Sequence, residues 1–476
     1  MSGVLKVFSP YSRLLIRGIS MHSAADVENA LASAFLLSSN RARWLTAYNR
    51  VSILEKTVTL LQDRKERLAC EASEEGGKPL ADSRIEIERG IQGVKVAIAS
   101  LHQMAGKEVP MELTPASKDR LAFTFREPIG VVAAVSAFNH PFNLIVHQVI
   151  PAVAVGCPVL IKPALATPIS CLNLVNTLHE AGLPSEWCRA LIIDNETAEK
   201  LVTDPRVAFF SFIGSSKVGW WLRSRLAPGA RCALEHGGAA PVIVEPDADF
   251  SEAVPLLAKG GFYHAGQVCV SVQRVYVHES VVSDFADALM RVARQMKVGD
   301  PLDERTEVGP LILEREVDRV DEWVKEASSG GGKILCGGKK LTDTCYAPTV
   351  LLNPPADARV TYQEIFGPVI CIYPYTDRLD AIRRANSLPY AFQAAIFTKN
   401  IDVAMDTVKR IDASAVMVND HTAFRVDWMP FGGRRLSGIG IGGISYTMQE
   451  MTQEKLVVIR TPALYPQIDT ENINHS

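Results

Sequence analysis

The sequence lacks any arrangement of cysteines that would indicate a structural metal, a redox pair or a disulfide framework. Its nine cysteines in 476 residues are odd in number and scattered, and no two stand at the spacing of a metal knuckle or a dithiol motif. We therefore expect reduced thiols, no bound metal and a cytoplasmic protein.

Long hydrophobic runs and a strong net charge are also missing. The longest apolar region, residues 129–161, is interrupted by Asn139-His140-Pro141, and residues 1–17 contain no apolar core of signal-peptide length. The formal net charge is −3 at pH 7, too small to indicate nucleic-acid binding. No repeat of solenoid period and no low-complexity linker occurs. We therefore expect neither a membrane span nor a nucleic-acid partner.

What the sequence does contain is the composition and periodicity of a large α/β enzyme. A chain of 476 residues is too long to fold around a single hydrophobic core, so two large domains are expected. A content of 47% hydrophobic and 22% charged residues is ordinary for such domains. Helical spacing dominates the N-terminal part, with expected helices over residues 24–34, 50–72 and 82–105. From residue 130 strand-like runs alternate with helices, which predicts parallel sheets covered by helices on both faces.

The later elements follow from the same pattern. Expected strands cover residues 121–128, 131–135, 158–162, 207–212, 242–244, 272–277, 334–336, 369–372 and 451–459, and expected helices cover residues 142–155, 170–182, 281–296 and 379–387, with a further one beginning at residue 216. We expect the strand 121–128 to project from the body and the last strand to pair with such a segment of another subunit. The tail after Pro462 is polar, and we expect it to be loose.

Cys269 lies on an irregular turn, in Gly266-Gln267-Val268-Cys269, between an apolar helix and a β-branched run. Backbone N–H groups can point into a cleft at such a turn, which suits a nucleophile. The alternative is a small buried hydrophobic residue, as most free cysteines are.

Two further polar residues interrupt apolar stretches. Glu235 precedes Gly237 and Gly238, where backbone can approach a ligand closely and partial burial would raise the carboxyl pKa toward that of a general base; a surface loop glutamate is the alternative. Asn139 interrupts an apolar run, so its amide is expected to be buried and aimed at a partner. A helix cap is the alternative there.

Residues 212–219, Phe-Ile-Gly-Ser-Ser-Lys-Val-Gly, join a strand to a helix in a way that suits an anion. Lys162 ends a strand at the sheet edge where open α/β sheets bind ligands. A plain serine-capped turn and a solvated lysine are the alternatives. His140 and His236 have no ligand-spaced partner, which argues against a metal.

Together these motifs resemble the aldehyde dehydrogenase superfamily over essentially the whole chain. Asn139, Lys162, Gly214-Ser215, Glu235, Cys269, Glu364-Ile365-Phe366-Gly367-Pro368 and Pro430-Phe431-Gly432-Gly433 occur in the order of that family. The resemblance implies an α/β fold with three parts: a Rossmann-like cofactor-binding domain (residues 1–108 and 128–237), an α/β catalytic domain (238–436), and a small β oligomerisation arm with the C-terminal segment (109–127 and 437–462). It also implies a homodimer or homotetramer.

The resemblance further implies NAD(P)-dependent oxidation of an aldehyde to a carboxylic acid. Cys269 would be the nucleophile that forms a thiohemiacetal and then a thioester, Asn139 the oxyanion amide, and Glu235 the general base for hydrolysis. Residues expected to hold NAD or NADP are Lys162 at the adenosine ribose, Gly214, Ser215 and Gly219 at the pyrophosphate, Glu364 at the nicotinamide ribose, and Phe366 near the nicotinamide.

Departures from the family pattern refine the expected ligands. Leu165 replaces a glutamate that commonly grips the adenosine ribose, so NADP should be tolerated beside NAD. The motifs are similar to those of phosphonoacetaldehyde and lactaldehyde dehydrogenases, but Val268 stands where the phosphonate enzymes have an arginine, which argues against a strongly anionic substrate. His140 and Arg425 are expected to line the aldehyde tunnel and to favour a polar or monoanionic short-chain aldehyde.

Two other functions remain as alternatives. A CoA-acylating aldehyde dehydrogenase would not need a water-activating base, so Glu235 argues against it. A dehydrogenase-like binding protein would be expected to lose Cys269, Glu235 or Asn139, and all three are present.

Overall fold

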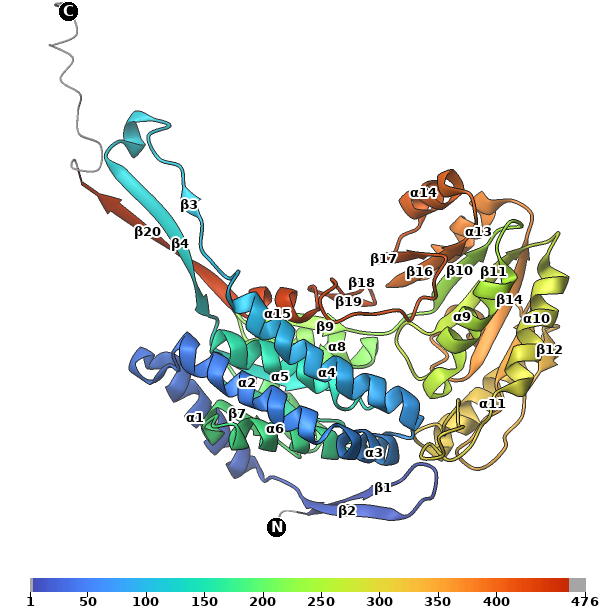
Figure 1. Cartoon of the computed structure of the whole chain (residues 1–476), viewed down its shortest axis with the longest axis horizontal. Coiled ribbons are helices and arrows are strands. Elements are labelled where there is room, and N and C mark those ends of the chain that lie inside the picture. The colour runs from blue at the N-terminus through green and yellow to red at the C-terminus, as the bar shows by residue number, and fades with distance from the viewer. Residues whose placement is uncertain (1–2, 462–476) are drawn as a thin grey trace, which may run out of the picture.

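The computed structural model describes residues 3–461 and contains two α/β bodies, each built on a mainly parallel sheet. In Figure 1 the body that contains the N-terminal half lies on the left and the body coloured yellow to orange on the right, with a β arm projecting away from the left-hand body. This arrangement confirms the predicted α/β class with two large bodies and a small β arm.

The first body is built on a sheet of six strands. Their spatial order is β19 (Gly438–Ile439), β9 (Arg231–Glu235), β8 (Val207–Ile213), β5 (Val131–Val135), β6 (Val159–Lys162) and β7 (Cys188–Ala190). All neighbours are parallel except β19 on β9. Successive residues of β5 enter cores on opposite faces: Val132 and Ala134 in one, Val131 and Ala133 in the other. A doubly covered parallel strand is therefore apolar throughout.

Helices cover both faces of this sheet. One core contains residues of α5 (Asn143–Val155), α6 (Ile169–Glu180), α2 (Ala47–Asp63), α3 (Lys65–Gly76) and α4 (Leu80–Leu101). The other core contains residues of α1 (Ala24–Ser39), α7 (Asn195–Val202) and α8 (Ser216–Arg223). The single helix predicted over residues 50–72 is wrong, because the chain breaks at Arg64, with φ −109° and ψ 3°, into α2 and α3.

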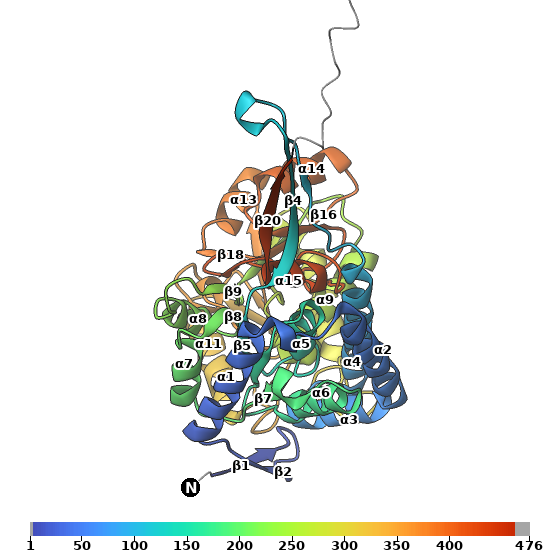
Figure 2. The ribbon, with the colours of Figure 1, turned by 90° about the vertical axis from the view of Figure 1, so that its left-hand side faces the viewer.

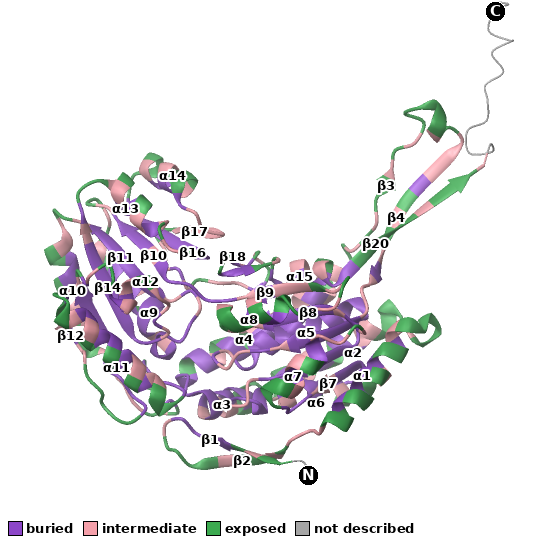
Figure 3. Ribbon diagram, turned by 180° about the vertical axis from the view of Figure 1, so that it is seen from behind, coloured by how far each residue is buried: buried purple, intermediate pink, exposed green. Residues whose placement is uncertain are grey.

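The second body is built on a sheet of seven strands. Their order is β12 (Lys333–Cys336), β13 (Thr349–Leu352), β14 (Val369–Tyr375), β11 (Val272–His278), β10 (Ala240–Val244), β16 (Gln393–Phe397) and β17 (Ala415–Val418). Only β12 is antiparallel to its neighbour. Its helices are α9 (Phe250–Phe262), α10 (Val282–Gln295), α11 (Glu314–Ser329), α12 (Arg359–Tyr362), α13 (Arg378–Ala385) and α14 (Ile401–Arg410). The central strands of this sheet are buried (Figure 3).

The projecting arm consists of β4 (Arg120–Pro128), β20 (Thr452–Arg460) and the short β3 (Glu108–Val109). Figure 1 shows the arm extending away from both bodies, and in Figure 2, with that side turned toward the viewer, β4 and β20 are drawn in front of the rest of the chain. β20 pairs antiparallel with β4 of its own chain from Thr452 opposite Pro128 to Arg460 opposite Arg120. The expectation that the last strand pairs with this segment of another subunit is therefore wrong. Before β20, α15 (Ile444–Glu450) packs against α5 and α4.

Several small elements were not predicted. An antiparallel hairpin, β1 (Val4–Phe8) with β2 (Leu15–Ser20), runs beneath the first body in Figure 1. A second short pair joins β15 (Tyr390–Ala391) to β18 (Arg434–Arg435), and single turns of 3-10 helix occur at 41–43, 115–117, 185–187 and 263–266. The predicted loose tail after Pro462 lies outside the described residues. Between residues 3 and 461, no helix combines the length and the apolar character needed to cross a membrane.

Candidate active site

A cavity of about 980 Å³ gathers the predicted site residues. Its walls come from the carboxyl ends of β5, β6, β8 and β9 in the first sheet and from the loops before β11 and after α12 in the second body. The predicted residues that line it are Asn139, His140, Lys162, Gly214, Ser215, Glu235, Cys269, Glu364, Phe366 and Arg425. The structure therefore brings residues from distant parts of the chain to one site.

Gly219 is the predicted residue that is absent from the cavity wall. It lies inside α8, where a Cβ would come within 2.0 Å of the His236 ring. That ring in turn forms a 2.9 Å hydrogen bond between Nδ1 and the carbonyl oxygen of Gly214. Close packing against the His236 ring thus accounts for a glycine at this position. Contact of Gly219 with the pyrophosphate stays a prediction.

Cys269 follows a turn with unusual backbone geometry. After α9, His264, Ala265 and Gly266 have φ angles of 49°, 53° and 68°, in the left-handed region that costs a residue with a Cβ roughly 1–2 kcal/mol. A Cβ at Gly266 would lie 2.1 Å from the carbonyl oxygen of Gly367, so only glycine fits this close approach. The strain indicates that surrounding contacts fix the turn.

The buried side chain of Gln267 provides those contacts. Its Nε2 donates to the carbonyl oxygens of His264 at 3.1 Å and Pro310 at 3.2 Å, and its Oε1 accepts the N–H of Ile312 at 3.0 Å. All three of these hydrogen bonds are in the protein interior, where an unmade bond would cost about 1–3 kcal/mol. Gln267 therefore holds the segment that presents Cys269 to the cavity.

The thiol of Cys269 is protonated at neutral pH in this environment. Burial raises its pKa to about 12, and the nearby carboxyl groups of Glu364 and Glu235 act in the same direction, while the Arg425 guanidinium opposes them. A thiolate is the nucleophilic form, so a base has to accept the proton when substrate reacts.

Glu235, the last residue of β9, is a suitable base. Burial raises the pKa of its carboxyl group, and Arg425 partly offsets that effect. The carboxylate occupies space left by Gly442, since a Cβ there would lie 2.3 Å from Glu235 Oε1. A carboxyl group with a raised pKa accepts a proton more readily near neutral pH than an exposed one.

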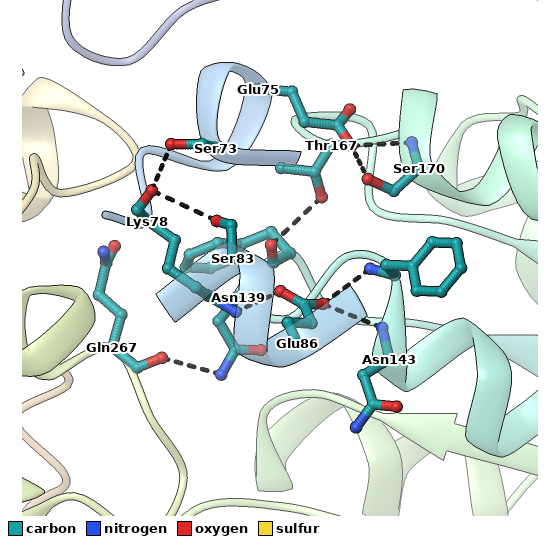
Figure 4. Close-up of polar contacts among 12 residues, drawn as sticks. Ser73, Glu75, Lys78, Ser83, Glu86, Asn139, Asn143, Thr167, Ser170 and Gln267 are labelled. Carbon is teal, nitrogen blue, oxygen red and sulfur yellow. Dashed lines mark hydrogen bonds and ion pairs between the residues drawn. The ribbon is translucent and has the colours of Figure 1, made fainter. Parts of the chain in front are cut away.

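Asn139 lies in the loop between β5 and α5 and is 5% exposed. Its Nδ2 donates a 2.8 Å hydrogen bond to the carbonyl oxygen of Gln267 (Figure 4). Because a side-chain amide has two N–H groups, this bond leaves the second one for another acceptor. The amide can therefore be fixed in place and still donate to an oxyanion.

The other end of the cavity carries polar groups of the kind that bind ribose and phosphate. Burial lowers the pKa of Lys162, whose Nζ has a long 3.4 Å contact to Asn195 Oδ1. Ser215 precedes α8 without using its hydroxyl as a side-chain cap. Glu364 Oε1 is buried without a hydrogen-bond partner in residues 3–461, and burial raises its carboxyl pKa to about 8. Phe366 has φ +48° and packs edge-on against Phe138 with centroids 5.9 Å apart.

The end of the cavity near Asn143 and Phe431 contains the predicted substrate residues. Arg425 is stacked 3.6 Å above the Phe431 ring, and its Nη2 lies 3.3 Å from His147 Nδ1. Burial lowers the pKa of His147 to about 4, so this neighbour is neutral at pH 7. Among the described residues Arg425 forms no ion pair with a carboxylate, and its Nε has no hydrogen-bond partner.

Sequence reasoning missed the charges that surround this end. Asp427 accepts from Arg89 at 2.9 and 3.1 Å, from Asn143 at 3.1 Å, and lies 2.7 Å from His147 Nε2. Arg89 itself lines the cavity from α4. Asp427 is thus hydrogen-bonded by these other groups and forms no ion pair with Arg425. The sequence around Arg89 in α4 does not distinguish it from an arginine that faces solvent.

The sequence matches known proteins over nearly its whole length. The sequence model of the aldehyde dehydrogenase family matches residues 2–457. The 3-sulfolactaldehyde dehydrogenase of Priestia aryabhattai is 39% identical over 456 residues, which cover 96% of this chain and 94% of that protein.

Solved structures of aldehyde dehydrogenases are also similar to this chain. The crystal structure of aldehyde dehydrogenase 21 from Physcomitrella patens in complex with the reaction product succinate has a TM-score of 0.93 and 35% identity, covering 96% of this chain and 95% of that one. Glyceraldehyde-3-phosphate dehydrogenase GapN from Methanocaldococcus jannaschii, complexed with NADP, has a TM-score of 0.91 and 34% identity, covering 97% and 100%.

Proposed function

Because this chain belongs to the aldehyde dehydrogenase family and is an NAD(P)-dependent aldehyde dehydrogenase, we propose that its substrate is a short-chain aldehyde with one anionic or strongly polar group. The observation that carries this proposal is the half-buried Arg425, which lines the cavity with Cys269 and forms no ion pair with a carboxylate in the described chain. Glu235 and Asp427 act on Arg425 electrostatically, but among the described residues neither forms an ion pair with it. A guanidinium without a direct carboxylate partner can donate charge-assisted hydrogen bonds to an anionic ligand.

We assign the catalytic roles to three residues. Glu235 accepts the thiol proton, and the Cys269 thiolate then adds to the aldehyde carbon. The free N–H of Asn139 and the backbone N–H of Cys269 donate to the resulting oxyanion. After oxidation the acyl group remains on Cys269 as a thioester. Glu235 releases the first proton to solvent and then removes a proton from the water that attacks the thioester. It gives this second proton to the departing Cys269 sulfur, which restores the thiol as the carboxylic acid leaves.

The cofactor residues fit a dinucleotide. The long contact of the Lys162 ammonium, the uncommitted hydroxyl of Ser215 and the unpartnered Oε1 of Glu364 are the polar groups that ribose and phosphate would satisfy. Lys162 would hold the adenosine ribose, Gly214 and Ser215 the pyrophosphate, Glu364 the nicotinamide ribose, and Phe366 would contact the nicotinamide. When bound, NAD or NADP supplies the hydride acceptor.

The relatives' names support an anionic or hydroxylated substrate. The P. aryabhattai relative is named for an aldehyde with a sulfonate and a hydroxyl group, and the P. patens structure contains a dicarboxylate product. In this chain Arg425 and His140 would meet the corresponding group. Arg89 also lines the cavity, but its charge is compensated by Asp427.

The function is tested by following reduced nicotinamide absorbance with neutral, hydroxylated, carboxylated, sulfonated and phosphonylated aldehydes, each with NAD and NADP. We expect turnover with an anionic or hydroxylated aldehyde, and none with Cys269→Ala. Addition of CoA should not accelerate the reaction, because Glu235 directs the thioester to water; acceleration would indicate the CoA-acylating alternative. Folded protein that binds cofactor and oxidises no aldehyde in the panel would favour the binding-protein alternative.

The role of Arg425 is tested separately. Arg425→Ala should raise KM for a carboxylated aldehyde about tenfold to a hundredfold, the effect of losing hydrogen bonds to a charged group. KM for propanal should change by less than about twofold on the same argument, since propanal has no anionic group. Equal changes for the two aldehydes would contradict the assignment. Arg425→Lys keeps the charge and should lie between wild type and the alanine variant.

We propose that the arm makes the enzyme a homodimer or homotetramer. Leu456, Val458 and Ile459 on β20 are 55, 50 and 42% exposed, and β17 ends the seven-stranded sheet with an unpaired edge. Exposed apolar side chains and open strand edges favour association. Val458→Asp should reduce the molar mass in sedimentation equilibrium, while Val4→Asp, at an exposed valine of the N-terminal hairpin, should not. A monomeric wild-type protein would contradict the proposal.

We also propose that the first body is the cofactor-binding domain and the second, which carries Cys269, is the catalytic domain. A cytoplasmic location is our proposal as well, and it is supported by nine cysteines that are all unpaired. Extracellular or periplasmic recovery of the native protein in cell fractionation would contradict it.

A further inference from the structure

Two buried carboxylates from the N-terminal helices hold the two helices that follow β5 and β6. Glu86, on α4, accepts the backbone N–H groups of Phe142 and Asn143 at 2.9 Å each, at the start of α5 (Figure 4). The residue before α5 supplies no side-chain cap of its own. Glu86 therefore caps α5 from another helix, where a negative charge is favoured by the helix dipole.

The charge of Glu86 is matched by one cation. Lys78 forms an ion pair with Glu86 through its Nζ, and both side chains are at most 2% exposed. Lys78 itself is fixed, because its carbonyl oxygen accepts the hydroxyl of Ser73 at 2.6 Å. Breaking a buried pair by removing one partner is strongly destabilising, by roughly 3–5 kcal/mol, since it leaves an uncompensated charge. Glu86 is thus held at the position that α5 needs.

Phe142, which donates its N–H to Glu86, is three residues after Asn139. The loop 139–142 packs closely against α4, since a Cβ at Gly90 would lie 2.6 Å from the Phe142 ring. On the other side the Asn139 amide donates to the carbonyl oxygen of Gln267, two residues before Cys269. A continuous series of buried contacts therefore runs from Lys78 and Glu86 through Asn139 to the turn that carries the thiol.

We propose that Glu86 and Lys78 are positioning residues that hold the Asn139 amide against the Cys269 turn so that its free N–H meets the oxyanion. The proposal rests on the proposed roles of Cys269 and Asn139. It follows from the geometry because the peptide of Phe142 anchors the loop that supplies Asn139, and a shift of about 1 Å in a donor can lower a rate a hundredfold.

Glu75 provides a matched comparison within the same helical block. It accepts the N–H groups of Ile169 and Ser170 at 2.7 and 2.8 Å and so caps α6 as Glu86 caps α5. The helix that it holds follows β6, one strand away from the Asn139 loop. A variant of Glu75 therefore loses the same kind of cap without a direct bond to the segment 139–143.

The test uses acylation of Cys269 by p-nitrophenyl acetate in the absence of cofactor. In this reaction the thiolate forms an S–C bond, an oxyanion develops on the carbonyl oxygen, and nitrophenolate leaves. The burst rate therefore depends on the thiolate and on the oxyanion donors, without any contribution from hydride transfer. We expect Glu86→Ala to lower the burst rate about tenfold to a hundredfold and Lys78→Met to lower it in the same direction. Glu75→Ala removes the cap of α6 as Glu86→Ala removes the cap of α5, and it should leave the rate within about twofold, because Glu75 does not touch the donor loop.

A double-mutant cycle distinguishes positioning from general destabilisation. In an Asn139→Ala background the Glu86→Ala change should lower the burst rate by less than about twofold, because the group that Glu86 positions is already gone. Equal losses in both backgrounds, or a normal burst in folded Glu86→Ala protein, would overturn the proposal. Should Glu86→Ala fail to fold, Glu86→Gln keeps one acceptor oxygen and is put through the same cycle. A burst that survives Cys269→Ala would instead overturn the proposed function.

Discussion

The side-chain amide of Asn139 donates a 2.8 Å hydrogen bond to the backbone carbonyl oxygen of Gln267. The two residues come from different bodies of the molecule, one after β5 and one before β11. This bond joins the cofactor-side loop to the thiol turn, and the amide N–H that it leaves free belongs to a group with little freedom to rotate. The donor that we propose for the oxyanion is thus fixed before substrate arrives.

Replacement of Asn139 by alanine should lower the acylation rate about 10²–10³-fold, the usual effect of removing one oxyanion donor. Stopped-flow measurement of the acylation burst checks this. Binding of NADP, followed by quenching of tryptophan fluorescence, should be unchanged, because the proposed dinucleotide contacts Lys162 and Ser215 are kept. A variant that acylates at the wild-type rate would remove Asn139 from the mechanism.

Inactivation of the cofactor-free enzyme by iodoacetamide should accelerate with pH. Because burial holds the Cys269 pKa at about 12, the thiolate fraction and the rate should rise about tenfold per pH unit between pH 7 and pH 9. Arg425→Ala should slow the reaction, since the guanidinium stabilises the thiolate. Arg315→Ala, a change at another arginine of the cavity wall, serves as the control. A rate that levels off near pH 8 would contradict a strongly raised thiol pKa.

Cofactor choice should respond to position 165. Leu165 lines the cavity and offers no carboxylate to the adenosine ribose, so wild-type KM values for NAD and NADP should differ by less than about a hundredfold, or 2.7 kcal/mol. Leu165→Glu should shift preference toward NAD by at least about tenfold, because a carboxylate repels the extra phosphate. Leu165→Gln, which has the same shape without the charge, should not repel NADP. Steady-state kinetics with both cofactors would show either outcome.

Stability should fall as pH rises through the titration of Glu75. Burial raises its carboxyl pKa from 4.5 to about 7, so the folded protein binds this proton more tightly than the unfolded chain. The resulting stabilisation is complete below pH 4.5 and is lost as pH rises through 7, with a magnitude of the order of 3 kcal/mol. Glu75→Gln cannot titrate. Its Tm relative to wild type should therefore rise between pH 5 and pH 8, and parallel Tm curves would contradict the assignment.

Much of the fold could be predicted because its strands are buried on both faces. Residues 131–135 were expected as a strand and form β5 with these bounds, since every side chain of the run is apolar. β9 was missed, because Arg-Cys-Ala-Leu-Glu contains no β-branched residue and its pairing with β8 is decided by tertiary contacts. The break at Arg64 was missed for the complementary reason that no glycine or proline marks it.

In the candidate site, too, some residues could be predicted from local sequence and others could not. Cys269, Glu235 and Asn139 interrupt apolar or glycine-rich stretches, so local sequence makes them visible, although their assigned roles await the experiments above. Lys78 lies in the segment Gly77-Lys78-Pro79 between α3 and α4, and Glu86 lies in an ordinary amphipathic helix. Only the fold reveals that Glu86 reaches residues 142 and 143. Contacts between residues so far apart leave no local signal.

The pairing of β4 with β20 has a consequence for how the protein is made. Residues 120–128 leave the ribosome long before residues 452–460, so β4 waits as an open edge until nearly the whole chain has been synthesised. Such an edge is a site of misassembly during folding. The arm is therefore the last part to be completed, and a chain that stops short of residue 452 lacks the strand that closes it.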